Sequence, residues 1–156
     1  MVMALRDELK QAKPFRSLEE EATLNIARTS AVLEHALAQA LKPYDITPTQ
    51  YNVLRILRGA GDAGLCRNAV GERLIRRVPD VTRLLDRMEQ LDLVARVRDG
   101  GDRRFVSTRL APKGKALVDR LDAEICAIHR EHLGHLTDDQ LHHLIGLLTA
   151  ARSQAP

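Results

Sequence analysis

The chain has 156 residues, with 44% hydrophobic and 29% charged side chains, a composition typical of one globular domain and not of a disordered chain. No apolar run approaches the roughly 18 residues of a membrane span. The N-terminus lacks a signal-peptide core, and Cys66 and Cys126 cannot form a disulfide framework, so we expect a cytoplasmic protein.

Basic residues are concentrated in the middle of the chain. The segment from Arg67 to Lys115 holds 13 of the 24 basic residues but only 7 of the 21 acidic ones. This local surplus favours a polyanionic partner, the alternative being basic residues that only solvate helix faces.

Capping boxes mark the starts of three predicted helices. A hydroxyl residue is followed three positions later by Glu or Gln at Ser17–Glu20, Thr47–Gln50 and Thr137–Gln140. In this pattern the hydroxyl accepts a hydrogen bond from the amide of the third helical residue, and the Glu or Gln reaches back. Apolar residues at helical spacing extend the first helix to Lys42-Pro43, and the second ends at the glycine-rich segment 59–64.

Two short helices and a β-hairpin are predicted next. One helix runs from about Cys66 to Arg76 and another begins at Pro79. The β-rich runs 93–98 and 105–110 then flank a turn, which predicts a hairpin. Pro112 begins a long helix before the last one. The fold is therefore predicted to be mainly α, with one small β-hairpin.

The order of these elements indicates a helix-turn-helix with a β-wing, in which the second short helix lies in the major groove of DNA. Its apolar side is expected to face the core, which leaves the following residues outward: Pro79, Asp80, Thr82, Arg83 and Arg87. Arg donates two bonds to guanine, Asp accepts from cytosine and Thr contacts thymine. A surface salt bridge from Arg83 to Asp80 or Asp86, and a capping role for Asp80, are the structural alternatives.

Four segments carry a family resemblance. They are Arg76 to Glu89, Leu93-Val94, Asp102-Arg103-Arg104 and the run Leu110-Ala111-Pro112-Lys113-Gly114. Together they resemble the MarR family of bacterial transcriptional regulators, over the chain from about residue 18 to residue 151. The Asp-x-Arg wing followed by Leu-x-Pro-x-Gly is the most specific part. Ala111 departs from the family's usual Thr, which puts the cap of the next helix in doubt.

The resemblance implies a winged-helix homodimer that binds a pseudo-palindromic operator in double-stranded DNA, often as a repressor. The family's wing arginine corresponds to Arg104, which would enter an A·T-rich minor groove with Asp102 orienting it. Arg103 would contact a phosphate or enter the groove as well. For Asp102 and Arg104, the alternative is an ion pair that only stiffens the hairpin. Arg67 and Asn68 are expected at phosphates, with ordinary solvent exposure as the alternative.

We expect residues 1–156 to form a single domain of this type. Residues 44–111 would form the winged helix-turn-helix lobe, and residues 17–43 and 112–151 the dimerisation helices. These helices carry more apolar surface than one small lobe covers, which indicates an interface. A twofold dimer would set the two recognition helices ~34 Å apart, about one turn of DNA.

The resemblance also implies that a small phenolic or other aromatic acid binds between the dimerisation helices and the lobe and releases the DNA. The candidate contacts are Phe15, Arg28, His35, Tyr44 and Tyr51. Each residue type is more often packed or solvated than ligand-binding.

Other regulators of the same fold sense zinc or oxidants. His129 and His132 can share a helix face, but Tyr51-Asn52 stand where zinc-sensing members carry a Glu-His pair, which favours solvated or interfacial histidines. Cys66 lies at a predicted helix N-terminus, a position that favours a reactive thiol, and Cys126 is expected in the core. A zinc- or redox-responsive regulator, or a helical metal-binding or interaction module without DNA binding, is the alternative function. We expect no cofactor and, because no catalytic motif is found, no enzyme.

Overall fold

The computed structural model describes residues 3–98 and 106–153. In these ranges the elements follow the predicted order of helices and hairpin, with three short additions. They are α1 (Leu5–Glu8), α2 (Leu18–Leu41), η1 (Lys42–Tyr44), α3 (Pro48–Ala60), η2 (Gly61–Ala63), α4 (Arg67–Arg73), α5 (Val81–Gln90), β1 (Val94–Arg98), β2 (Val106–Leu110), α6 (Pro112–Leu133) and α7 (Asp138–Ser153).

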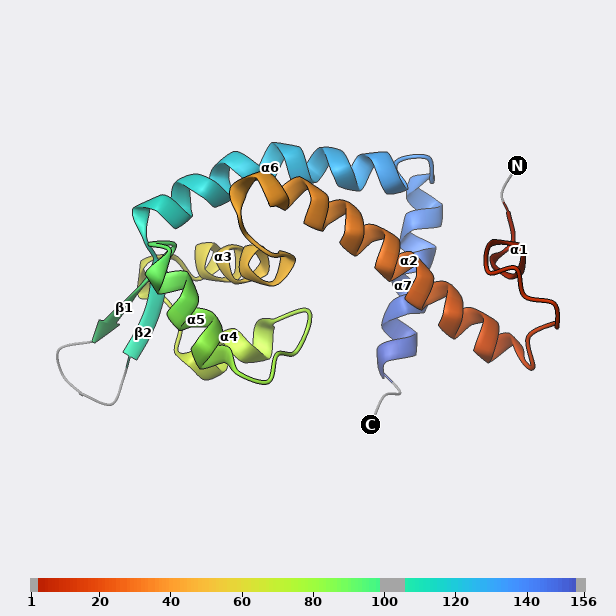
Figure 1. Ribbon diagram of the computed structural model, residues 1–156, viewed down its shortest axis with the longest axis horizontal. Helices are drawn as coiled ribbons and strands as arrows, with labels where there is room; N and C mark the ends of the chain where they lie inside the picture. Colours follow the sequence, from red (N-terminus) through yellow and green to blue (C-terminus); the bar gives the residue numbers. More distant parts are fainter. Residues whose placement is uncertain (1–2, 99–105, 154–156) are drawn as a thin grey trace.

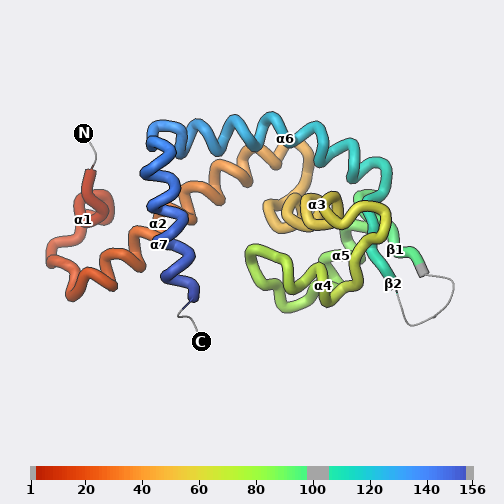
Figure 2. The backbone as a smooth tube through the Cα atoms, turned by 180° about the vertical axis from the view of Figure 1, so that it is seen from behind, coloured from red at the N-terminus to blue at the C-terminus, as the bar shows by residue number. Residues whose placement is uncertain are grey.

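Helices α3, α4 and α5 and the hairpin form a small lobe at one end of the molecule (Figure 1). Helix α6 runs from the hairpin across this lobe, packs on α2 and α3, and leads at its far end to α7 (Figures 1 and 2). Helices α1, α2 and α7, here called the outer helices, extend away from the lobe. No helix in the described ranges is long and apolar enough to cross a membrane.

Two of the three predicted capping boxes are complete. The Thr47 hydroxyl accepts from the Gln50 amide, and the Gln50 side chain accepts from the Thr47 amide at 2.8 Å. The box that begins α7 has the same two bonds. At the start of α2, Ser17 accepts from the Glu20 amide, but the Glu20 carboxylate accepts from the amide of Arg16 instead of closing the box. All three motifs begin helices as predicted.

The core lies where the small lobe meets α6. From α2 only Leu41 is buried, and α7 buries no side chain. The cluster comprises Leu41, Ile46, Tyr51, Val53, Leu54, Leu57, Val70, Leu74, Leu85, Met88, Leu93, Val94, Val118, Leu121 and Ile125. The lobe and the first two thirds of α6 therefore share one core, and most of the outer-helix surface lies outside it.

Three details differ from the prediction. Helix α5 begins at Val81 and not at Pro79, because the Asp80 carboxylate accepts from the Arg83 amide at 2.9 Å and so occupies the cap position. Helix α4 ends at Arg73, since the backbone of the next residue is extended. Cys126, expected in the core, is exposed on α6.

Two glycines are required where chain segments touch. A Cβ on Gly114 would lie 2.0 Å from the Leu93 carbonyl oxygen, so the first turn of α6 rests directly on the residue that precedes β1. Gly64 has a φ of +66°, a left-handed value that favours glycine, and a Cβ there would lie 2.5 Å from the Thr108 carbonyl oxygen. The neighbouring Leu65 forms a bridge with Thr108, which joins the hairpin to the segment between η2 and α4.

Candidate nucleic-acid interface

Helices α4 and α5 form a helix-turn-helix whose inner sides reach the core through Val70, Leu85 and Met88. The two helices approach closely, because a Cβ on Gly71 would lie 3.1 Å from a methyl group of Val81. The outer sides of both helices are left to solvent. This arrangement lets α5 serve as a recognition helix supported by α4.

A hollow between α4 and the start of α5 brings together five of the residues predicted to contact DNA: Arg67, Asn68, Pro79, Asp80 and Thr82. Arg67 donates from Nη1 to the Thr82 hydroxyl at 3.1 Å and from Nε to the Asn68 side-chain oxygen at 3.4 Å. The Asp80 carboxylate lies in the same hollow but is engaged in capping α5. Residues of α4 and of the start of α5 that were predicted to contact DNA therefore form one polar surface.

Arg83 and Arg87 point into solvent from α5. In the described ranges neither guanidinium has an ion pair. The alternative salt bridges from Arg83 to Asp80 or Asp86 do not form in these ranges, because the Asp80 carboxylate caps the helix and Asp86 pairs with Arg96. Two cations on the exposed side of α5 thus remain available to an external partner.

The hairpin is fastened to α5 through Arg96 of β1. Its guanidinium pairs with Asp86 and lies 3.9 Å from a carboxylate oxygen of Glu89. The Glu89 carboxylate also accepts from the Arg96 backbone amide at 3.1 Å. The strands pair antiparallel, from Val94 opposite Leu110 to the last described pair before the turn. Helix α5 and the wing strands are therefore joined by side chains as well as by the chain.

Asp102, Arg103 and Arg104, predicted to contact DNA from the wing tip, lie outside the described residues. Their proposed roles remain predictions from the sequence.

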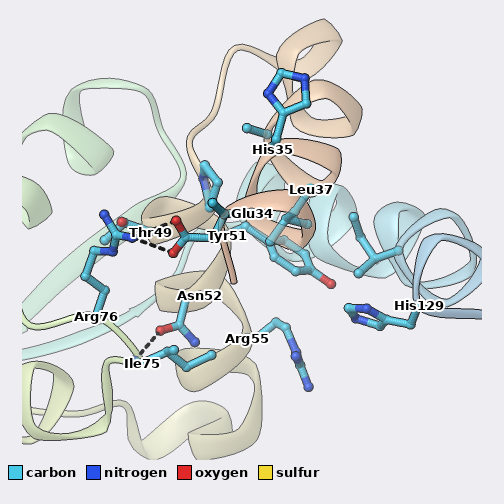
Figure 3. Close-up of a pocket in the computed structure, with 14 residues that line it drawn as sticks. Glu34, His35, Leu37, Thr49, Tyr51, Asn52, Arg55, Ile75, Arg76 and His129 are labelled. Atoms are coloured by element: carbon cyan, nitrogen blue, oxygen red, sulfur yellow. Dashed lines mark hydrogen bonds and ion pairs between the residues drawn. The ribbon is translucent and has the colours of Figure 1, made fainter. Parts of the chain in front are cut away.

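A cleft of about 550 Å³ separates the small lobe from α2 and α6 (Figure 3). On one side, Arg76 Nη2 donates to both carboxylate oxygens of Glu34 of α2, each at 2.6 Å. His129 of α6 lies on the opposite side (Figure 3). Asn52 accepts from the Ile75 backbone amide at 3.0 Å. The polar side chains in the wall of the cleft are Glu34, His35, Thr49, Tyr51, Asn52, Arg55, Arg76 and His129.

Comparisons with known proteins agree with this geometry. The model of the MarR family matches residues 44–104. The uncharacterized HTH-type transcriptional regulator YkoM of Bacillus subtilis is 30% identical, over 88% of this chain and 90% of its own. The chain belongs to the MarR family of transcriptional regulators. This is a family of regulators and not of enzymes.

Two solved MarR structures resemble the chain over most of its length. The MarR transcription factor from Planctomyces limnophilus is 34% identical, with a TM-score of 0.66 over 88% of this chain and 99% of that one. A mutant MarR from E. coli, solved in complex with operator DNA, is 26% identical, with a TM-score of 0.72 over 83% of this chain and 91% of that one. The winged helix-turn-helix predicted from the sequence is thereby confirmed.

The predicted effector contacts of this MarR protein fall into two groups. His35 and Tyr51 line the cleft. Tyr44 instead donates to Glu124 of α6 at 2.9 Å, and this bond raises the pKa of the Tyr44 hydroxyl. Arg28 pairs with Glu8 of α1 at 3.3 Å. Phe15 is half-buried in the segment between α1 and α2 and is not among the cleft residues.

Several residues of these sites had no signal in the sequence. Glu34 and Arg76 are 42 positions apart, so no local pattern predicts that they meet across the cleft. In the sequence, Arg55 has the position of an exposed helix residue, and only the fold places it in the wall of the cleft. Arg96 lies in a run that predicts a strand, but its carboxylate partners belong to α5.

The histidines and cysteines give no metal site within the described ranges, where no three His, Cys, Asp or Glu side chains are grouped to hold an ion. His129 lies at the cleft, whereas His132 is half-buried further along α6. Cys66 is exposed beside Arg67, in a second hollow between α4, α5 and the wing.

Proposed function

We propose that this MarR protein binds a pseudo-palindromic operator as a homodimer and represses transcription until a small ligand releases it. The observation that carries the proposal is the single unit formed by α5 and the wing, with Arg83 and Arg87 unpaired on its outer side in the described ranges. Such a unit presents cations to two neighbouring grooves of one DNA duplex.

In the major groove, the N-terminal turn of α5 would place Thr82 and Arg83 against base edges. Arg83 can donate two hydrogen bonds to one guanine. Arg67 and Asn68, joined to Thr82 through the Arg67 bonds, would contact the adjacent phosphates. The proposal is supported by the E. coli relative, whose structure was solved with operator DNA.

The outer helices support the proposed homodimer. Their large apolar side chains are exposed in the single chain, up to 81% for Leu18 and 60% for Ile145. A helix with one apolar side gains stability by covering that side, and a second copy of the chain offers a matching one. The exposed set on α2 and α7 comprises Leu18, Leu24, Ile26, Val32, Leu144, Ile145 and Leu147.

The cleft supports the proposed release by a ligand. Its wall combines Arg55 and Arg76 with Tyr51 and two histidines, a set suited to an aromatic acid. Because the cleft lies between the lobe and α2, a ligand in it would change the position of α5 in one subunit relative to the other. The ligand-free arrangement would then be the one that fits the operator.

Affinity selection of genomic DNA fragments by the intact protein tests this function. With roughly eight phosphates neutralised, the logarithm of the affinity for a selected fragment should fall with the logarithm of salt concentration at a slope near −7. A reporter placed behind that fragment should be silenced by the protein. A flat salt response, or stoichiometric metal binding without DNA affinity, would favour the non-DNA-binding alternative.

A further inference from the structure

We propose that Arg96 is a positioning residue, which sets the distance and angle between the wing and α5 so that both reach DNA together. The inference rests on the proposed DNA binding and assigns a role to a residue that need not touch DNA. It is carried by the two carboxylates that hold this one side chain.

The geometry of the contact fixes more than a distance. Asp86 and Glu89 lie three positions apart on α5 and therefore on one side of the helix. Glu89 binds both the side chain and the backbone amide of Arg96, while Asp86 binds the far end of the guanidinium. A planar group attracted at separate points loses rotational freedom, so these contacts restrain the orientation of β1 as well as its position.

The base of the wing is packed, because Val94 is buried in the core and β2 contacts α3, α4 and α6. Beyond this base the described wing is a two-stranded ribbon, which is marginally stable on its own, so a further contact is needed there. The chain enters β1 shortly after Asp92, whose φ of 58° makes a sharp turn between helix and strand. Leu65 supports β2 through its bridge with Thr108, the residue opposite Arg96 in the ladder. Arg96 supports the other strand at the same level.

Two other roles for Arg96 make different predictions. As a simple cation near DNA, it would lose nothing if its acidic partners were neutralised. As a contributor to folding, it would change the stability of the protein. The Arg96 side chain is 30% exposed and its partners are more exposed, and ion pairs of this kind contribute little to stability.

Neutralising the carboxylates separates these roles by the sign of the effect. The double variant Asp86→Asn, Glu89→Gln removes two negative charges beside the DNA surface, so charge alone predicts tighter binding and a steeper salt dependence. Positioning predicts weaker binding, by about ten-fold, because the wing contact is lost in each half-site. The probe is a duplex that the wild-type chain selects from a randomised pool. Tighter binding by the double variant would overturn the proposal.

Glu72→Gln is the matched control. Glu72 is exposed on α4, at the hollow between α4 and the start of α5, and has no ion pair in the described ranges, so its neutralisation should leave affinity unchanged or raise it. Arg96→Lys keeps the charge but has a single donor group, which cannot hold both carboxylates in one plane. It should bind more weakly than wild type, with an unchanged melting temperature. Wild-type affinity in Arg96→Lys would show that only the charge matters.

A measurement without DNA keeps the inference separate from the proposed function. Spin labels at Arg73→Cys on α4 and Val106→Cys on β2, with Cys66 and Cys126 replaced by Ser, report the distance between the helix pair and the wing. The distribution should broaden in Arg96→Met and stay narrow in Arg58→Met, which breaks a similar ion pair between α3 and α6. An unchanged distribution in Arg96→Met overturns the positioning role. If wild type selects no duplex, the proposed function fails while this result still stands.

Discussion

The small lobe and the outer helices are built on different principles. The lobe surrounds fully buried side chains such as Leu54, Leu57 and Met88. Helix α7 buries none, and the 24-residue α2 buries only Leu41, at its end next to the lobe. The lobe is thus built around a core that it shares with α6, whereas the outer helices gain little tertiary stabilisation within the single chain.

Helix α6 belongs to both regions and shows where the change occurs. Its first two thirds contribute Val118, Leu121 and Ile125 to the core, and the rest leads away to α7. The lobe is fastened to this helix by Arg58 and to α2 by Arg76. In the proposed dimer, a movement of the outer helices would therefore be transmitted to α5 through the shared core and through these polar contacts.

The largest expected effect comes from the core of the lobe. Leu54→Ala removes a fully buried side chain of α3 and should lower the free energy of unfolding by about 2–5 kcal/mol. Urea denaturation followed by circular dichroism measures the loss. Leu147→Ala, on the exposed side of α7, is the control and should change the stability of the monomeric chain little. Equal losses in both variants would contradict the distinction between the two regions.

A smaller effect is expected where the lobe meets DNA. Arg83→Ala should cost roughly 1–3 kcal/mol of binding free energy and relax discrimination at one base pair in each half-site. Arg104→Ala should instead weaken binding mainly at sites with A·T-rich flanks, because a wing arginine reads the width of the minor groove.

Binding to a series of single-base operator variants distinguishes these two arginines, with circular dichroism to show that both variants are folded. If Arg83→Ala weakens every operator variant equally, Arg83 contacts a phosphate and does not read a base.

The outer helices should respond through assembly instead. Ile145 is 60% exposed in the single chain, and its burial in a dimer is worth about 1 kcal/mol. Because both subunits carry the change, Ile145→Ala should cost the dimer about 2 kcal/mol and raise its dissociation constant about thirty-fold in sedimentation equilibrium, with the lobe intact. A wild-type chain that sediments as a folded monomer at all concentrations would remove the basis of this expectation.

In both regions, some elements could be predicted from the sequence and others could not. Local chemistry identified the helix starts at Thr47 and Thr137 and the hairpin, because capping and strand periodicity act over a few residues. It misplaced the start of α5 by favouring Pro79 over the capping Asp80. The four-residue α1 is too short for any period to reveal.

For the site, the outward residues of α5 followed from helical periodicity. The Arg67 bond to Thr82 and the cleft pair Glu34–Arg76 did not, because residues distant in sequence are brought together only by the packed fold. The same holds for Tyr44, whose partner Glu124 is 80 positions away.

The smallest expected effect concerns the contact between the lobe and α6. Arg58 donates to both carboxylate oxygens of Asp122, at 2.6 and 2.9 Å, and these bonds hold the pKa of Asp122 below its ordinary value. A carboxylate with a lowered pKa in the folded state stabilises the fold above its unfolded pKa, and this contribution is lost as pH falls through the folded value. The stability difference between wild type and Asp122→Asn should therefore be constant near neutral pH and shrink below about pH 4.

Urea denaturation at a series of pH values measures this difference. Asp62→Asn, which neutralises an exposed aspartate without an ion pair in the described ranges, is the control and should show no comparable pH-dependent gap. Because both partners are accessible to solvent, added salt should reduce the gap at neutral pH. A gap that persists unchanged in acid would mean that the Asp122→Asn substitution disturbs packing between α3 and α6, and that the charge of the aspartate contributes nothing to joining the lobe to the helix.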